Sequence, residues 1–253
     1  MAVRIPTIQS KKPAVDGEPA PNAYHGHRER QRRRILEGAE ALFDEHGIDR
    51  VTMADITSAS GIRASTLYQY FSNKDDIVWA ILSDAFKEVA QRTEKKLESA
   101  KTGLAKITTL LDLIATELWN NPAKVRFLAQ FDAMYARHWP AERMLTLEAQ
   151  INPKGFEFFG ELVREGIADG SLRPDLDPDL TMHAVINAVI GAQRRLASLG
   201  DKVELEYGQP IERLFLETIR IIVLGLRAPE SAAHSKCSES SNSRKSSTRK
   251  RRP

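Results

Sequence analysis

Cysteine is almost absent from this sequence of 253 residues, and long apolar runs are absent altogether. The single cysteine, Cys237, excludes a disulfide framework within one chain and a zinc site built from several cysteines. We therefore expect a reducing, cytoplasmic setting. No stretch approaches the roughly 20 apolar residues that cross a bilayer, and the N-terminus lacks the basic-then-apolar order of a secretory signal, so we expect no membrane contact.

Charge of one sign is not in large excess either: 37 lysines and arginines oppose 34 aspartates and glutamates, for a formal net charge of +3. So mild an excess does not by itself indicate a polyanionic partner, but the basic residues gather toward both ends of the chain. Residues 1–27 combine four prolines with polar neighbours, and residues 229–253 are rich in serine, lysine and arginine. We expect a disordered arm and a disordered basic tail.

Between these ends the sequence has helical periodicity. Apolar residues recur at spacings of three and four, and no run alternates as a half-buried strand would. The predicted fold class is therefore all-α, with an N-terminal three-helix domain over 28–74 and a C-terminal helical domain over 75–228. Beyond the first four helices, we expect helices over about 104–119, 122–138, 141–168, 178–199 and 211–226.

Capping and turn residues delimit the first helices. Gly47 ends the first one, because glycine adopts the left-handed conformation that closes many helices. A second helix is predicted over 53–60, where Thr52 and Asp55 have nearly the pattern of a capping box. A short third helix over 64–71 follows a tight turn, and an asparagine cap then begins a long fourth helix.

Residues 52–71 have the pattern of a helix-turn-helix motif. Apolar residues are spaced so that the two helices pack together, namely Met53, Ile56, Ala59, Ile62, Leu67 and Phe71. A short second helix suits the major groove of B-DNA, about 12 Å wide, where donors and acceptors on base edges are readable. The motif predicts sequence-specific binding to double-stranded DNA, and the alternative is a pair of packed helices that never contacts DNA.

The exposed face of the third helix supplies the candidate DNA contacts. Arginine pairs with guanine, glutamine pairs with adenine, and a threonine methyl meets the methyl of thymine. Tyrosine hydroxyls and a lysine beside a helix N-terminus suit phosphates. The candidate DNA-binding residues are Thr52, Arg63, Ala64, Ser65, Thr66, Tyr68, Gln69, Tyr70 and Lys74. For Tyr68 and Tyr70, packing against the first and fourth helices is the alternative.

Three strings in this region resemble the DNA-binding domain of the TetR/AcrR family of transcriptional regulators: TMADI at 52–56, ASGI at 59–62 and TLYQYFSNK at 66–74. The resemblance covers roughly residues 28–82. In addition, GIADGSLRPDLDPDL at 166–180 is similar to the connection before that family's dimerisation helices. The resemblance implies a homodimer in which the later helices form a regulatory domain with a ligand cavity.

The sequence departs from the family pattern in the turn. Arg63 stands where a small hydroxyl residue commonly caps the recognition helix, and Ser65 stands where glycine is common. An arginine side chain has no acceptor for a backbone N–H. We therefore expect Arg63 to leave that cap unmade and to reach DNA instead.

The middle helices carry more aromatic surface than a tight bundle needs, including Trp139 and Phe159, and this suits an apolar ligand cavity. The candidate ligand-binding residues are Trp119, Phe127, Phe131, Met134, Tyr135, His138, Phe158 and His183. Ordinary core packing is the alternative for each. We expect no metal and no cofactor, because no histidine or carboxylate pair has ligand spacing in a convincing context.

The last two predicted helices have the features of a dimer interface. Small residues permit close approach on the first, namely Ala184, Ala188, Gly191 and Ala192, and the second is rich in leucine and isoleucine. Two such helices from each subunit would form a four-helix bundle. Completion of the core within one subunit is the alternative.

The combined prediction is a homodimeric transcriptional regulator, a repressor that a small-molecule effector releases from a palindromic operator. Activation through the same site is one alternative. A helical-bundle enzyme is another, but the sequence lacks a nucleophile elbow, a phosphate-binding glycine loop and a zinc-protease motif, and we predict no enzyme activity. A third is an architectural protein that binds DNA without sequence preference through its basic ends.

Overall fold

A computed structural model of the protein describes residues 21–151 and 157–229. Over these residues the chain forms eleven α-helices and no β-strand, apart from one isolated antiparallel bridge between Leu172 and Arg227. The all-α fold class is therefore confirmed. Across the same two ranges, no helix is both long enough and apolar enough to cross a membrane.

The predicted N-terminal arm overlaps the first helix. Its first 20 residues lie outside the described residues, as does the predicted tail after residue 229. At 21–27, however, the chain is helical, because α1 runs from Pro21 to His46. The arm boundary at residue 27 is corrected accordingly. Residues 21–27 have little apolar periodicity to indicate a helix, and proline is tolerated in a first helical turn.

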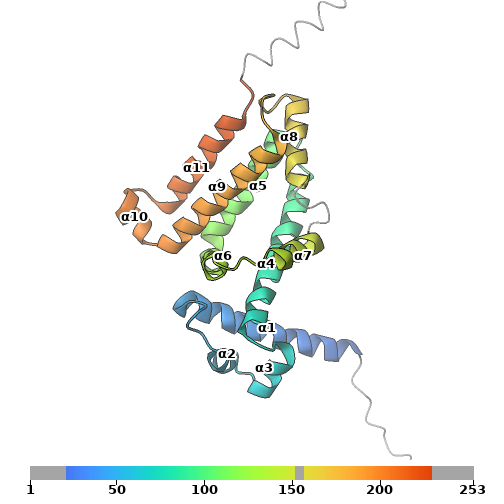
Figure 1. The fold of residues 1–253 in the computed structure, drawn as a ribbon, viewed down its shortest axis with the longest axis vertical. Coiled ribbons are helices and arrows are strands. Elements are labelled where there is room, and N and C mark those ends of the chain that lie inside the picture. The colour runs from blue at the N-terminus through green and yellow to red at the C-terminus, as the bar shows by residue number, and fades with distance from the viewer. Residues whose placement is uncertain (1–20, 152–156, 230–253) are drawn as a thin grey trace, which may run out of the picture.

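Three helices form one end of the molecule, and a fourth leads away from them (Figure 1). After α1 come α2 (Met53–Ser60), α3 (Ala64–Tyr70) and α4 (Lys74–Leu97). The predicted starts of α2 and α3 are confirmed, and α3 ends one residue earlier than predicted. Local sequence signals therefore set the boundaries of this end of the chain.

The predicted caps are present at these boundaries. Thr52 Oγ1 accepts a hydrogen bond from the Asp55 backbone N–H at 3.3 Å, and the Asp55 carboxylate accepts one from the Thr52 N–H at 2.8 Å. This reciprocal pair is the capping box. Gly47 is left-handed with φ 86°, and Asn73 Oδ1 accepts from the Asp76 N–H at 2.9 Å to begin α4.

Seven further helices build the rest of the described chain. They are α5 (Gly103–Asn120), α6 (Pro122–Tyr135), α7 (Ala141–Ile151), α8 (Glu157–Asp169), α9 (Pro178–Leu199), α10 (Lys202–Tyr207) and α11 (Ile211–Leu226). The predicted bounds of α9 and α11 are confirmed at both ends. The short helix α10, which Gly208 caps at its C-terminal end, was not predicted.

One predicted helix is two helices in the structure. The expected helix over 141–168 ends at Ile151, and α8 begins at Glu157. The sequence between them contains Pro153 and Gly155. Proline inside a helix loses a backbone hydrogen bond and clashes with the preceding turn, and glycine is a poor helix former. Residues 152–156, which include both, lie outside the described residues.

The buried apolar side chains form two cores. The first lies among α1, α2, α3 and α4 and includes Phe127 and Phe131 of α6 and Leu147 of α7. Along α4 it extends to Leu82, which is beyond the predicted domain boundary at residue 74. The second is built from α5, α8, α9, α10 and α11, and takes in Val125 of α6. Since α6 contributes to both cores, it ties them together.

Two glycines allow α5 and α8 to approach closely. A Cβ added at Gly103 would lie 2.6 Å from the carbonyl oxygen of Leu162 and closer still to the backbone of Gly166. A Cβ at Gly166 would in turn overlap the Leu172 side chain. This crossing fixes α5 against α8 in the second core.

Replacing Gly103 by alanine is expected to lower the free energy of unfolding by about 1–3 kcal/mol, because the added methyl meets backbone atoms. Chemical denaturation of the variant and the wild type measures the difference. Gly170→Asn is the matched control, since Gly170 has φ 78°, a Cβ there meets no atom within 4 Å, and asparagine tolerates this conformation. Equal stability of Gly103→Ala and wild type would contradict the close crossing.

Candidate nucleic-acid interface and ligand cavity

Helices α2 and α3 pack as a helix-turn-helix. Ile56 of α2 and Leu67 of α3 are fully buried, and Gly61 makes the turn between them with φ 63°. Arg34 of α1 donates a hydrogen bond to the Ser60 carbonyl oxygen at 2.9 Å, which holds the end of α2 on α1. The predicted packing is confirmed except at Ala59, which is exposed.

The outward face of α3 carries the residues predicted to read DNA. Its exposed residues are Arg63, Ala64, Ser65, Tyr68 and Gln69, and Thr66 is half-buried. Tyr68 keeps 56% of its surface exposed. Arg63 stands at the N-cap position of α3 and makes no side-chain cap, as its chemistry predicts.

Three of the candidate DNA-binding residues also make contacts within the protein. The Tyr70 hydroxyl donates to Gln31 Oε1 of α1 at 2.9 Å. Lys74 Nζ donates to the carbonyl oxygens of Ile48 at 2.6 Å and Asp49 at 3.2 Å. The Thr52 hydroxyl belongs to the capping box. These side chains stabilise the frame that presents α3, and their contact with DNA stays a prediction.

Basic residues of α1 extend the positively charged surface beside α3. Arg28, Arg30 and Arg33 are exposed, and the Arg28 guanidinium lies 5.6 Å from the centre of the Tyr70 ring. Arg32, by contrast, is paired with Asp84 of α4 at 2.8 Å. Arg34 is exposed as well, but it holds the Ser60 carbonyl oxygen, so Arg28, Arg30 and Arg33 are the arginines at this end of α1 best placed to meet phosphates.

The end of α1 is clasped by α6. Arg126 of α6 donates two hydrogen bonds to the Asp44 carboxylate, at 2.6 and 2.8 Å. Gln130 accepts from the Ile48 N–H at 2.9 Å and donates to the Phe43 carbonyl oxygen at 3.1 Å. We call these contacts the α1–α6 clasp. The Arg126 hydrogen bonds hold the pKa of Asp44 below its ordinary value.

A cavity of about 480 Å³ lies among α4, α6, α7, α8 and α9. Its lining residues are Leu82, Phe86, Phe131, Asp132, Trp139, Met144, Phe159, His183, Ile186, Asn187, Ile190 and Arg194. The structure thus brings two of the candidate ligand-binding residues, Phe131 and His183, to one cavity. It also places there Trp139 and Phe159 of the predicted aromatic surface.

The other candidate ligand-binding residues lie away from the cavity lining. Phe127 stacks on Phe43, with ring centres 6.2 Å apart. The Tyr135 hydroxyl donates to Asp75 and accepts from Trp79 Nε1. The remaining ones pack against the two cores or are exposed, namely Trp119, Met134, Phe158 and His138. Helical periodicity marks such residues as apolar but does not say which neighbour each one meets.

A charged pair interrupts the apolar lining of the cavity. Arg194 of α9 forms a salt bridge with Asp132 of α6. Burial lowers the pKa of Arg194 to about 10, so the guanidinium remains charged at neutral pH. Its Nε has no hydrogen-bond partner within the described part of the chain. The sequence did not reveal this pair, because charged residues on amphipathic helices are usually solvated.

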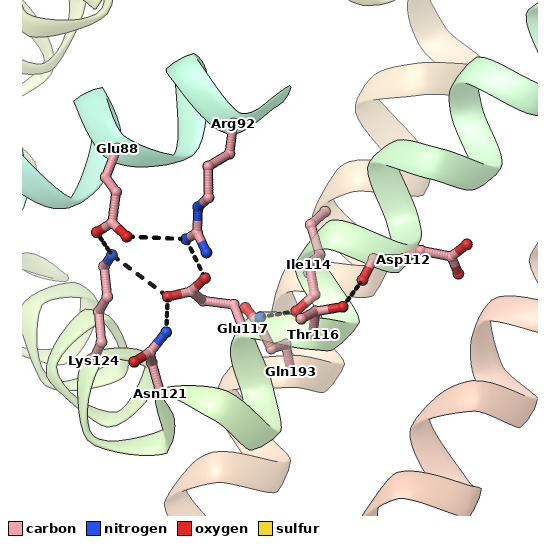
Figure 2. A network of polar contacts seen from close by, with 9 residues as sticks. All are labelled: Glu88, Arg92, Asp112, Ile114, Thr116, Glu117, Asn121, Lys124 and Gln193. Atoms are coloured by element: carbon pink, nitrogen blue, oxygen red, sulfur yellow. Dashed lines mark hydrogen bonds and ion pairs between the residues drawn. The ribbon is translucent and has the colours of Figure 1, made fainter. Parts of the chain in front are cut away.

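A buried carboxylate joins α4, α5 and α6 (Figure 2). Glu117 of α5, with 9% of its side chain exposed, accepts hydrogen bonds from Arg92 of α4 and, at 2.8 Å, from Asn121. Lys124 of α6 lies 3.4 Å from Glu117 and 2.7 Å from Glu88, and its hydrogen bond holds the pKa of Glu88 below the ordinary value. A buried carboxylate is stable only when paired, so this network fixes the three helices together.

No three histidine, cysteine, aspartate or glutamate side chains are grouped to hold a metal ion in the part of the chain that the structure describes. The arrangement instead offers two surfaces for binding. One is the outward face of α3 with the neighbouring arginines of α1, and the other is the cavity beside α6. The α1–α6 clasp connects them.

The N-terminal helices match a known family. Residues 35–81 match the bacterial regulatory proteins of the tetR family. The chain is also 29% identical, over 159 residues, to the HTH-type transcriptional repressor KstR2 of Mycolicibacterium smegmatis, a stretch that covers 58% of this chain and 70% of that protein.

Solved structures share the fold beyond these helices. The ketosteroid transcriptional regulator KstR2 of Mycobacterium tuberculosis aligns with a TM-score of 0.59 at 23% identity, covering 79% of this chain and 96% of that chain. A transcriptional regulator from Saccharomonospora viridis in complex with choline aligns with a TM-score of 0.62 at 19% identity, covering 79% of this chain and 100% of that chain. The likeness therefore includes the C-terminal helices.

Replacing Asp44 by asparagine is expected to destabilise the protein by about 1 kcal/mol at neutral pH, because Arg126 loses its charged partner. The folded-state pKa of Asp44 is lowered, so its stabilising effect is present above the pKa of the unfolded chain and is lost as pH falls through the folded pKa. The difference between variant and wild type should therefore shrink below about pH 4.

Chemical denaturation over a series of pH values measures this difference. Asp49→Asn is the matched control, because Asp49 is exposed and its side chain makes no ion pair among the described residues. A constant difference between Asp44→Asn and wild type down to pH values well below 4 would show that the carboxylate charge is not what stabilises the clasp.

Proposed function

The chain belongs to the TetR/AcrR family of transcriptional regulators, and we propose that it is a homodimeric repressor that a small-molecule ligand releases from a palindromic operator. The observation that carries the proposal is the outward face of α3, where side chains suited to base edges stand exposed on a rigid frame. Repression, rather than activation, is supported by the similarity to KstR2 of Mycolicibacterium smegmatis, which is a repressor.

Helix α3 would read one half-site from the major groove. Gln69 and Arg63 have the donors and acceptors for adenine and guanine, and Thr66 offers a methyl group to thymine. Tyr68 and the exposed arginines of α1 would meet phosphates, which position the protein without reading sequence. Because α3 is held on α1 and α2 by buried Leu67 and by capped helix ends, these side chains are presented in a fixed orientation.

Dimerisation through α9 and α11 would supply the second reading head. On α9 the small residues Ala184, Ala188 and Gly191 are exposed at helical spacing, so another helix can approach this face closely. On α11, Leu216, Ile221 and Leu224 are exposed, with 47%, 58% and 51% of their surfaces accessible. Exposed apolar helices side by side favour an intersubunit four-helix bundle.

The ligand would act through α6. This helix lines the cavity with Phe131 and Asp132, and it holds the end of α1 with Arg126 and Gln130. A ligand that favours one position of α6 would bias the position of α1 and hence the separation of the two recognition helices. A coupling free energy of about 1–3 kcal/mol is typical of such regulation.

Replacing both Thr66 and Gln69 by alanine is expected to weaken operator binding at least about tenfold, because each base contact contributes about 1–3 kcal/mol. Footprinting on the DNA that flanks the gene, with excess random duplex as competitor, measures the protected palindrome. Gln91→Ala is the control, since Gln91 is exposed on α4 away from α3. Unchanged protection by the double variant would overturn the assigned reading face.

Replacing Ala188 by glutamate is expected to convert the dimer to a monomer, because a charged side chain would be buried where helices approach closely. Light scattering coupled to gel filtration measures the mass. Ala168→Glu is the matched control, since Ala168 is exposed on α8. A dimer of Ala188→Glu as stable as the wild type would exclude this face of α9 from the interface.

A further inference from the structure

The polar groups of the cavity are confined to α9 and one residue of α6. Eight of the twelve lining residues are apolar or aromatic. Three of the other four, His183, Asn187 and Arg194, follow one another at helical spacing along α9, and the fourth is Asp132. Residues 183 and 194 are about 16 Å apart along a helix axis. The cavity therefore has a long apolar wall and a polar edge that ends at a guanidinium.

Arg194 is the permanent positive charge of this cavity. A guanidinium has five N–H donors arranged to match a carboxylate. Here the acceptor that pairs with it is Asp132, and its Nε has no hydrogen-bond partner in the described chain. Only 21% of the Arg194 side chain is exposed, and a buried cation without an anionic partner is costly. Any ligand that enters must leave Arg194 with an anion.

The two members of the pair are not equally able to move. Asp132 keeps 36% of its side chain exposed, against 21% for Arg194, so the carboxylate is the member that can turn toward solvent. An anionic ligand can take its place on Arg194 and keep the charge compensated. A cationic ligand would instead have to displace the more buried Arg194 from Asp132. The asymmetry favours an acid over a base.

We infer that the cavity binds an amphipathic carboxylic acid whose apolar part lies against the aromatic wall and whose carboxylate replaces Asp132 as the partner of Arg194. This inference rests on the proposed function, because it names the ligand class of the regulatory site. The wall is provided by Phe86, Phe131, Trp139 and Phe159. Arginine and carboxylate would form a bidentate pair.

The exchange of partners on Arg194 also supplies the regulation. Asp132 is on α6, the helix that clasps α1 through Arg126 and Gln130. While Asp132 is paired with Arg194, this salt bridge holds α6 against α9. When the ligand carboxylate pairs with Arg194, the Asp132–Arg194 salt bridge is broken and α6 can shift together with the end of α1. The same contact therefore recognises the ligand and transmits its presence.

Decanoate, its neutral counterpart decanamide and the cation decyltrimethylammonium are suitable probes, because they share an apolar chain and differ in the head group. Isothermal titration calorimetry with the full-length protein should show decanoate binding at least about tenfold more tightly than either of the others. Quenching of tryptophan fluorescence provides a second readout, since Trp139 lines the cavity.

Two variants and one control test the role of the pair. Arg194→Gln should abolish the preference for decanoate over decanamide. Asp132→Asn should raise the affinity for decanoate about tenfold, because the competing carboxylate is gone. The increase in Tm that decanoate produces should also be larger in this variant. The affinity for decanamide should not change. Arg195→Gln is the matched control, because Arg195 is exposed on the same helix and pairs with Glu206.

Equal binding of the three probes, tighter binding of the cation, or weaker decanoate binding by Asp132→Asn would each overturn the inference. Operator binding without ligand is measured in parallel. If the protein binds its operator but its preference for decanoate over decanamide does not depend on Arg194, the ligand class is refuted and the proposed repressor stands. Absence of operator binding would refute the repressor whatever the probes show.

Discussion

The contact between α1 and α6 is the constraint on which the rest of the structure depends. The helix-turn-helix is fixed on α1, the cavity is bounded by α6, and the Asp44–Arg126 pair with the hydrogen bonds of Gln130 joins the two. The stacking of Phe43 on Phe127 buries the apolar part of the same contact. Without it, the two cores would be joined chiefly through α4, which also lines the cavity with Leu82 and Phe86.

Helix α6 is short, yet it is held from several sides. Arg126 binds α1, Lys124 binds the Glu88–Glu117 network of α4 and α5, and Asp132 binds α9. At its end, Tyr135 donates to Asp75 in the first turn of α4. Packed interfaces of this kind respond to a change in one contact by moving between discrete arrangements rather than by bending smoothly. A small change at Asp132 is therefore able to reach the end of α1.

How well the sequence predicts a feature depends on how far apart along the chain the interacting residues are. The caps at Thr52 and Asn73 and the turn at Gly61 were predictable, because each depends on residues within a few positions. The division between α7 and α8 was missed although Pro153 signals it, since apolar spacing on both sides suggested one helix. The Asp132–Arg194 pair was out of reach, because it joins two helices whose packing no local pattern specifies.

Release from DNA requires a ligand contact that differs between the two positions of α6, because a ligand that binds both equally shifts nothing. Apolar burial is non-directional, so filling the apolar part of the cavity does not by itself give a ligand a preference for one position of α6. Arg194, in contrast, cannot pair fully with Asp132 and with a ligand carboxylate at once. Because the two pairings of Arg194 exclude each other, the contact of the ligand carboxylate with Arg194 is the one that differs between the two positions of α6. By linkage, operator DNA must then weaken ligand binding by the same factor that the ligand weakens DNA binding.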